Sequence, residues 1–570
     1  MAHEERFDVV IVGSGFGGSV MAYRTAAAKL SVCLLERGKP YPPGSFPRSP
    51  RDMAANFWDP SEGGHGLYQA WASPKMEAVA SAGLGGGSLI YANVLIRKDE
   101  RWFVQPNPVT GAAEDWPVTR TELDPHYERA EQVLAPQRYP LDVEPYASTP
   151  KTLAFRGAAQ RAELDWSLPS LAITFNNPGH PAVPGEPIAE AEPNLHGRTR
   201  YTCRLVGECD VGCNFGSKNS LDFNYLTMAQ REGALLRTRC EVRSFAPRAE
   251  GGFTVWYVEH SPEDEGHKTN TGGLEQRAVT CDRLVLSAGT FGSTYLLLKN
   301  HSSFPLLSER LGTRLSGNGD LLGFIRRPKG WATDGRVPGL APSLGPVITS
   351  TLRVADTVDG GDGPGYYIQE GGLPGFAQWA LEAADTPGEA VRATRFAARE
   401  VWGAVRHTPK SDLGGEISIL LGGGEDSDGL MILLGMGRDT PNGVMSLRGK
   451  WLELEWDVSR SKTYFDRVKA TMARLAHELD AEFEINPLWY LRKVITVHGL
   501  GGCPMGRDPD QGVVDSHGQV FNYPGLFIAD GSVMPGPVGP NPSLTIAALS
   551  DRFADALVDQ ATHKAGYVNR

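Results

Sequence analysis

The distribution of apolar residues predicts alternating strands and helices at the start of the chain. Residues 9–12 and 31–35 are short apolar runs with the length of buried strands. A glycine-rich turn and a stretch long enough for a helix separate them. Parallel strands need a connection of this length, so the pattern predicts a strand–helix–strand unit within a parallel sheet.

Periodicity predicts further elements in the second half of the chain. Residues 451–456 alternate apolar and acidic side chains, which is typical of a strand with one face in water. Apolar residues recur at helical spacing between Phe465 and Leu479, which predicts an amphipathic helix over a sheet. The other expected elements are helices at 221–231, 293–298 and 545–558, and strands at 234–242, 283–288, 416–421 and 429–434.

Composition restricts the class of protein. Hydrophobic residues at 41% and charged residues at 22% are typical of a soluble globular chain. The net charge of −11 argues against nucleic acid or an anionic membrane surface as a partner. We find no secretory leader and no apolar run of about 20 residues. Seven cysteines are an odd and modest number. Together these features favour a cytoplasmic protein without a membrane span.

The glycine-rich turn has the spacing of a dinucleotide-binding fingerprint. Gly13 permits the tight turn, Gly15 lets the backbone approach a pyrophosphate, and Gly18 lets the next helix pack closely. Glu36, at the end of the second apolar run, can accept hydrogen bonds from a ribose. The alternative is a glycine-rich turn without a ligand. The strand before the turn and the acid after it favour binding of FAD or NAD over NADP.

Three further segments carry a resemblance to a known family. Residues 497–506 read Val-His-Gly-Leu-Gly-Gly-Cys-Pro-Met-Gly, residues 538–543 read Val-Gly-Pro-Asn-Pro-Ser, and residues 85–88 read Gly-Gly-Gly-Ser. Together with the fingerprint, they resemble the glucose–methanol–choline (GMC) family of flavoprotein oxidoreductases. Within it the chain looks most similar to the non-covalent cholesterol oxidases and their actinobacterial relatives. The likeness rests on specific motifs at both ends of the chain, whereas residues 101–200 and 313–490 match only in their general pattern of residues.

The resemblance implies a flavin site with named residues. His498 would face the flavin, with Asn541 as its partner. A neutral His can accept or orient a hydroxyl proton, and an Asn amide can hold the oxygen. Residues 76–94 contain no His, so we expect non-covalent FAD. The residues expected at FAD are Gly13, Gly15, Phe16, Gly17, Gly18, Glu36, Gly86, Gly87, Ser88, Tyr91, Ala92, Asn93, Val94, Val242, Asp530, Gly531 and Ser543.

Glu370 and a group of three cysteines each allow two interpretations. Glu370 precedes two glycines, and the resemblance to steroid oxidases implies a carboxylate that shifts a proton and isomerises the product. The alternative is a solvated turn residue. Cys203, Cys209 and Cys213 lack a fourth ligand nearby and a Cys-x2-Cys pair, so we expect buried thiols and no metal site.

The chain is too long for one core, and we expect an α/β Rossmann-like FAD-binding domain with an inserted mixed-sheet (α+β) substrate-binding domain. The expected function is FAD-dependent oxidation of an apolar alcohol, steroids being one candidate class, with oxygen or another electron acceptor. Sugar or aryl alcohols, a non-redox lyase or photodecarboxylase, and a nucleotide-binding module are alternatives. Residue types do not distinguish an oxidase from a dehydrogenase, or define the oligomeric state. We expect the FAD-binding domain to comprise residues 1–43, 218–312 and 498–570. Residues 44–217, which include the glycine loop 81–94, are expected to cover the FAD and to contribute to the substrate domain. Residues 313–497 are expected to form the substrate-binding domain.

Overall fold

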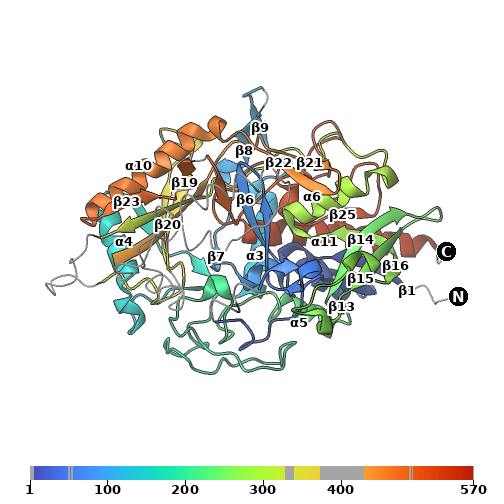
Figure 1. Ribbon diagram of the computed structural model, residues 1–570, viewed down its shortest axis with the longest axis horizontal. Coiled ribbons are helices and arrows are strands. Elements are labelled where there is room, and N and C mark those ends of the chain that lie inside the picture. Colours follow the sequence, from blue (N-terminus) through green and yellow to red (C-terminus); the bar gives the residue numbers. More distant parts are fainter. Residues whose placement is uncertain are drawn as a thin grey trace.

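The computed structural model describes residues 5–48, 52, 56–108, 110–327, 339–372, 429–486, 489–490 and 492–568. Figure 1 shows two large sheets on opposite sides of the molecule, with both ends of the described chain beside the first sheet. The expected strand at 416–421 lies outside the described residues.

The first sheet combines a parallel half with an antiparallel half. Strand β1 pairs in parallel with β2 and β16, and β2 pairs in parallel with β13. The long β16 pairs with antiparallel β15 along its first part and with parallel β25 along its last three residues. In sheet order the strands are β13 (Leu235–Arg237), β2 (Val32–Leu35), β1 (Glu5–Val12), β16 (Gln276–Leu286), β15 (Phe253–Glu259) and β14 (Cys240–Pro247), with β25 (Leu526–Ile528) on β16. The parallel strands end at one edge, where open α/β sheets bind ligands.

Helices bury this sheet. Helix α1 follows β1 directly, packs against α5 and α11, and α11 in turn packs against α3. Residues Val9, Val10 and Ile11 are fully buried as a result, which explains why this strand is apolar on both faces. The helices are α1 (Phe16–Ala27), α3 (Arg120–Leu134), α5 (Tyr225–Arg231), α6 (Gly289–Lys299) and α11 (Ser543–Val568).

The second sheet is antiparallel throughout. Its six strands, in order, are β11 (Asp165–Ser167), β18 (Thr351–Val354), β19 (Tyr366–Gly371), β20 (Leu430–Gly437), β17 (Leu321–Arg326) and β23 (Glu482–Ile485). Helices α10 (Lys462–Glu478) and α4 (Pro150–Arg161) contact each other and this sheet (Figure 1). Phe465, Val468 and Met472 of α10 are fully buried, which confirms the predicted amphipathic helix.

Smaller elements connect the two sheets. Strand β24 (Val494–Thr496) pairs in parallel with β6 (Met76–Ser81), which also pairs with β5 (Tyr68–Ala72). This small sheet fixes the chain just before His498. The remaining short strands are β3 (Trp58–Asp59), β4 (Gly64–His65), β7 (Val94–Leu95), β8 (Val104–Pro106), β9 (Ala113–Asp115), β10 (Gln137–Arg138), β12 (Ser170–Leu171), β21 (Val444–Arg448) and β22 (Trp451–Glu455).

The predicted strand at 234–242 is wrong as a single element. The chain forms two strands, β13 and β14, that pair with different partners. Arg239, between them, has a φ of 60°, a left-handed conformation that a continuous strand cannot contain. Backbone bonds from Arg239 to Gly38 and from Cys240 to Glu36 hold this bend against the end of β2. The predicted helix at 221–231 starts later, at Tyr225, because the Asn224 side chain accepts a bond from the Tyr225 N–H there.

Candidate functional site

The glycines after β1 divide into two groups by what surrounds them. A Cβ on Gly17 would lie 1.5 Å from the Ala529 carbonyl oxygen, and one on Gly18 would lie 2.0 Å from that of Gly13. Gly13 has a φ of 98° and faces the Ser287 carbonyl. These three glycines therefore permit close packing of the protein against itself. A Cβ added to Gly15, by contrast, would meet no atom of the described chain within 4 Å.

The free space at Gly15 lies at the amino end of α1. Gly15 is the N-cap of this helix and no side chain caps it, so the first N–H groups remain available. Such a helix end attracts phosphate through its N–H groups and its dipole. Phe16, the first residue of the helix, lies edge-on to the ring of Tyr91 at 5.3 Å between ring centroids.

Glu36 is buried beside this turn. One carboxylate oxygen accepts hydrogen bonds from the Ser14 N–H at 3.0 Å and the Ser14 hydroxyl at 2.6 Å. The other accepts one from the Gly38 N–H at 2.8 Å. A carboxylate has about four lone-pair sites, so this arrangement fixes the side chain and still leaves acceptor capacity for a ribose.

The second glycine loop packs directly on the first. A Cβ on Gly86 would lie 2.6 Å from the Gly15 Cα, whereas Gly87 faces open space within the described structure. Gly86, Gly87 and Ser88 form a 3-10 helix, η2 (Gly86–Leu89). The Ser88 hydroxyl donates to the Gly85 carbonyl at 2.7 Å and accepts from the Leu221 N–H at 3.0 Å. The structure therefore gives Ser88 a role in holding this loop.

Asn93 is the most informative polar residue of the loop. Its side chain is fully buried, and neither atom of its amide has a hydrogen-bond partner among the described residues. A buried amide without partners costs roughly 1–3 kcal/mol per group, so this one indicates a polar ligand. Ala92 and Val94 flank it. The Val94 carbonyl accepts a bond of 3.5 Å from Ser543, the first residue of α11.

Asp530 and Gly531 follow Ala529, whose carbonyl lies against Gly17, and Val242 lies on β14. Asp530 accepts bonds from the Ser532 N–H and hydroxyl and from the Ser293 hydroxyl of α6, and burial raises the pKa of its carboxyl. A Cβ on Gly531 would lie 2.8 Å from the Thr290 hydroxyl. Val242 is buried on β14, next to a bulge and near the carboxyl end of β2.

His498 is held by a carboxylate that the sequence analysis did not identify. Its Nδ1 lies 2.7 Å from one oxygen of Asp320, which is fully buried just before β17. The other Asp320 oxygen accepts from the N–H groups of Val497 and His498 at 2.9 and 3.2 Å and from the Thr496 hydroxyl. A carboxylate only accepts hydrogen bonds, so Nδ1 carries a proton, and in the neutral imidazole the lone pair is on Nε2.

Asn541 is held by Gln369 of β19. The Gln369 Nε2 donates to the Asn541 Oδ1 at 2.7 Å, and the Asn541 Nδ2 donates to the Gln369 Oε1 at 3.3 Å. Asn318 also fixes the backbone before Asn541, with bonds to Gly539 and Pro540. Asn318 and Asp320 belong to one turn, at residues 316–320. The structure thus ties both predicted catalytic residues to the same turn.

Glu370 faces away from Asn541. Successive side chains of a strand point to opposite faces, so Glu370 points away from the face on which Gln369 meets Asn541. It is fully buried and forms an ion pair of 2.6 Å with Lys151. It also accepts bonds from the N–H groups of Thr349 and Ser350 and from both hydroxyls. Glu370 is thus held by Lys151 and the 349–350 segment, while its neighbour Gln369 takes the face toward Asn541.

All seven cysteines lie within the described residues and are free thiols. Burial raises the pKa of Cys209 to about 11 and raises that of Cys203 further, so both are protonated in neutral solution. Lys218 donates to the carbonyls of Cys209, Leu89 and Tyr91, which fastens the cysteine-bearing loop to the second glycine loop. The loop thus supports the site structurally.

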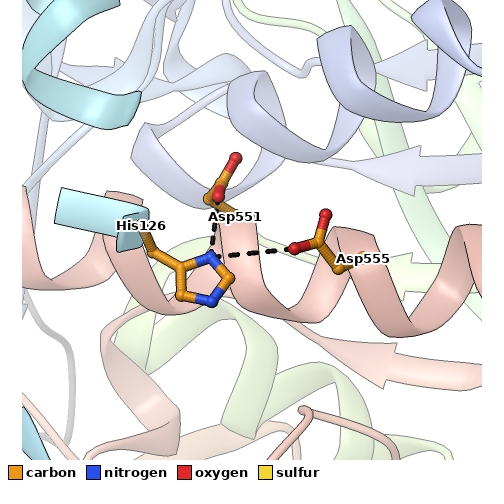
Figure 2. A group of neighbouring side chains, drawn as sticks. All are labelled: His126, Asp551 and Asp555. Atoms are coloured by element: carbon orange, nitrogen blue, oxygen red, sulfur yellow. Dashed lines mark hydrogen bonds and ion pairs between the residues drawn. The ribbon is translucent and has the colours of Figure 1, made fainter. Parts of the chain in front are cut away.

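One group of side chains in the described part of the chain has the spacing of a metal site. Figure 2 shows His126 of α3 beside Asp551 and Asp555 of α11. Arg24 and Arg129 pair with the same two carboxylates. Two guanidinium groups balance two carboxylates, so we interpret the group as an ion-pair network that joins α1, α3 and α11.

Comparison with known proteins identifies the family. Residues 435–550, which contain His498 and Asn541, match the family model described as GMC oxidoreductase. A cholesterol oxidase of Mycobacterium tuberculosis is 30% identical over 563 residues, covering 96% of this chain and 90% of that protein. The chain belongs to the GMC oxidoreductase family.

Two other proteins extend the likeness. A 2-methyl-1,2-propanediol dehydrogenase of Mycolicibacterium austroafricanum is 23% identical, covering 98% of this chain and 97% of that protein. The crystal structure of pyridoxine 4-oxidase from Mesorbium loti covers 96% of this chain and 98% of its own, with a TM-score of 0.56 at 17% identity, which shows the shared fold.

Membership of the GMC family confirms several predictions. The protein is a flavoprotein oxidoreductase that acts on CH–OH groups, with an α/β nucleotide-binding fold and a second domain. It takes a small-molecule substrate and an electron acceptor. Among the helices of the described residues, none is long and apolar enough to span a membrane.

Proposed function

We propose that the protein binds FAD non-covalently in the region between the two glycine loops, the amino end of α1 and the start of α11. Open space at Gly15 and Gly87 and the unpartnered amide of Asn93 support this. The helix end and Gly15 would hold the pyrophosphate, Glu36 would hold the ribose, and Asn93 would meet the ring system. These residues fit the cofactor that the family uses.

We infer that His498 accepts the hydroxyl proton of an alcohol substrate. Its Nε2 is free because Asp320 fixes the proton on Nδ1. Asn541 offers an N–H to the alcohol oxygen and restricts the carbinol carbon to one orientation. Bound FAD would supply the hydride acceptor. Asp320 would stabilise the positive charge that His498 gains with the proton, because its carboxylate lies in direct contact.

The surroundings of His498 favour an apolar alcohol, and we propose a steroidal one. Val497, directly before His498, is 55% exposed although its side chain is apolar. On the other side, a Cβ on Gly499 would touch the ring of Phe291, which stacks on Trp71 at 6.0 Å between centroids. Apolar groups thus lie at both chain neighbours of His498. The similarity to a cholesterol oxidase supports the same class of substrate.

The single observation that carries this proposal is the contact between the His498 Nδ1 and Asp320. Its test is anaerobic flavin bleaching by a panel of cholesterol, benzyl alcohol, glucose and 2-methyl-1,2-propanediol. We expect cholesterol to bleach the flavin, and His498→Ala to slow bleaching by about a hundredfold or more while FAD stays bound. Bleaching by a polar alcohol alone would reject the steroidal substrate, and bleaching by none would reject the proposed function. Acid precipitation of the holoenzyme should leave a colourless pellet, because no covalent bond holds the FAD.

A further inference from the structure

The side chain of Gln369 meets that of Asn541 in the interior of the molecule. Gln369 is fully buried and Asn541 is 6% exposed. They come from different parts of the fold, since Gln369 lies in the centre of the second sheet and Asn541 precedes α11. Two hydrogen bonds join them in both directions, from the Gln369 Nε2 to the Asn541 Oδ1 and from the Asn541 Nδ2 to the Gln369 Oε1.

This pairing determines which groups of Asn541 remain free. A side-chain amide has two N–H donors and one carbonyl oxygen. Gln369 engages the oxygen and one N–H of Asn541, so one N–H is left to meet a substrate. Without the Gln369 donor, the amide could rotate by half a turn at little cost in shape, because its oxygen and nitrogen are nearly equal in size. It would then present an acceptor in place of the free N–H.

Other residues hold the backbone of the same loop. Lys98 is fully buried and donates to the carbonyls of Pro537 and Val538 at 2.9 and 3.0 Å. Asn318 bonds to Gly539 and Pro540. Lys98 and Asn318 thus fix the position of this loop. The bond from Gln369 therefore controls the orientation of the Asn541 amide and not the position of the loop.

We propose that Gln369 is a positioning residue that acts through Asn541, fixing its amide so that the free N–H points to the alcohol oxygen. This role rests on the proposed function and deepens it. Gln369 is a neutral amide, so on this face of β19 it supplies a hydrogen-bond donor and an acceptor but no base. The face therefore suits a neutral hydroxyl group, with His498 as the group that takes its proton.

The test uses two substitutions of Gln369 in the full holoenzyme. Gln369→Glu keeps the size and the acceptor, but an ionised carboxylate cannot donate to the Asn541 oxygen and would turn the amide around. Once protonated, it can donate again and restore the native arrangement. Gln369→Met keeps the length but offers neither bond at any pH. Asn541→Ala gives the rate without the amide.

The rate of anaerobic flavin reduction is measured against pH, using the alcohol of the panel that bleaches the wild-type flavin fastest. Dividing each rate by the wild-type rate at the same pH removes the pH dependence that the variant shares with the wild type. We expect Gln369→Glu to be about ten- to a hundredfold slower at high pH and to recover as the pH falls. We expect Gln369→Met to be slow throughout, close to Asn541→Ala.

The outcomes separate the inference from the proposed function. If both Gln369 variants reduce the flavin at the wild-type rate, or if the Gln369→Glu ratio is the same at every pH, the positioning role is rejected and alcohol oxidation stands. If none of the four alcohols bleaches the wild-type flavin, the proposed function fails and the role of Gln369 fails with it. If Gln369→Met does not fold, the pH dependence of Gln369→Glu alone decides.

Discussion

The Nδ1 of His498 lies 2.7 Å from a buried carboxylate oxygen of Asp320, and this contact joins the segment after β24 to the turn before β17. His498 follows the small sheet that contains β24, and Asp320 directly precedes β17 of the second sheet. The second oxygen of Asp320 accepts two backbone N–H groups of the same segment. The imidazole therefore has one tautomer and one orientation.

Asp320→Asn tests this relationship. An amide can donate to Nδ1 and so favour the wrong tautomer, and it no longer stabilises a protonated imidazole. A corresponding substitution in a Ser–His–Asp triad lowers the rate by about 10⁴ with the geometry intact, and we expect a loss of about a hundredfold or more here. Rapid-mixing measurement of flavin reduction gives the rate.

The matched control is Asp282→Asn, which makes the same chemical change at an exposed ion pair with Arg6. It should reduce the flavin at the wild-type rate. An Asp320→Asn enzyme that also kept the wild-type rate and pH profile would contradict the role of Asp320. FAD content should be the same in both variants, since neither residue lies at the glycine loops.

The two classes of glycine predict opposite results for the same substitution. In Gly15→Ala the new methyl group meets no described atom, so the apoprotein should keep its stability while FAD binding weakens strongly. In Gly17→Ala the methyl group would overlap the Ala529 carbonyl, which should destabilise the protein by about 3 kcal/mol or more. Thermal unfolding of the apoprotein and titration with FAD separate the two effects. Loss of stability in Gly15→Ala with unchanged FAD affinity would contradict this assignment.

Local patterns in the sequence predicted the first sheet and its glycine turn because each element there is specified by neighbouring residues. The fingerprint needs only a strand, three glycines and an acid at fixed spacing. The sequence did not predict the break between β13 and β14, because arginine is not a residue type that favours the left-handed conformation found at Arg239. The bend is set by backbone bonds to Gly38 and Glu36, far away in the sequence.

The resemblance identified His498 and Asn541 as candidate catalytic residues, but the sequence did not identify their hydrogen-bond partners. Asp320 and Gln369 lie 178 and 172 residues away from them along the chain. Neither residue belongs to a motif, and only the pairing of strands in the second sheet brings them to the site. The resemblance to steroid oxidases pointed to Glu370 and not to its neighbour Gln369. Alternation along β19 places the amide, not the acid, on the side of Asn541.

The ion pair of Lys151 and Glu370 predicts a structural role for that acid. Glu370→Gln leaves a buried ammonium group without its counter-ion, which should destabilise the protein by about 3–5 kcal/mol. Lys151→Met/Glu370→Gln removes both charges and should recover part of this loss. Urea unfolding of the two single variants and the double variant measures the coupling.

The double variant also tests the catalytic expectation for Glu370. If the acid is structural, the double variant should oxidise alcohol at close to the wild-type rate and give the same product as the wild type. Product analysis after complete oxidation of cholesterol decides this. A wild-type product with a migrated double bond that the double variant fails to form would restore the isomerase role.

The last prediction concerns Asp439, which holds the turn that carries Asn318 and Asp320. Its oxygens accept bonds from the Ser316 hydroxyl and from the N–H groups of Gly317 and Gly319. Burial raises the pKa of this carboxyl to about 7, and the nearby carboxylate of Asp320 adds to the effect. In the unfolded chain it titrates near 4, as an ordinary Asp does.

Between about pH 4 and pH 7 the native protein therefore binds a proton at Asp439 that the unfolded chain does not, so this contribution to stability is lost as the pH rises through that window. The slope is about 1.4 kcal/mol per pH unit for a single group. Asp439→Asn cannot titrate. The free energy of unfolding of the wild type, minus that of the variant, should fall as the pH rises to about 7 and then stay constant. Urea unfolding across this range measures the difference, and parallel curves for the two proteins would show that Asp439 is already ionised in the acid range.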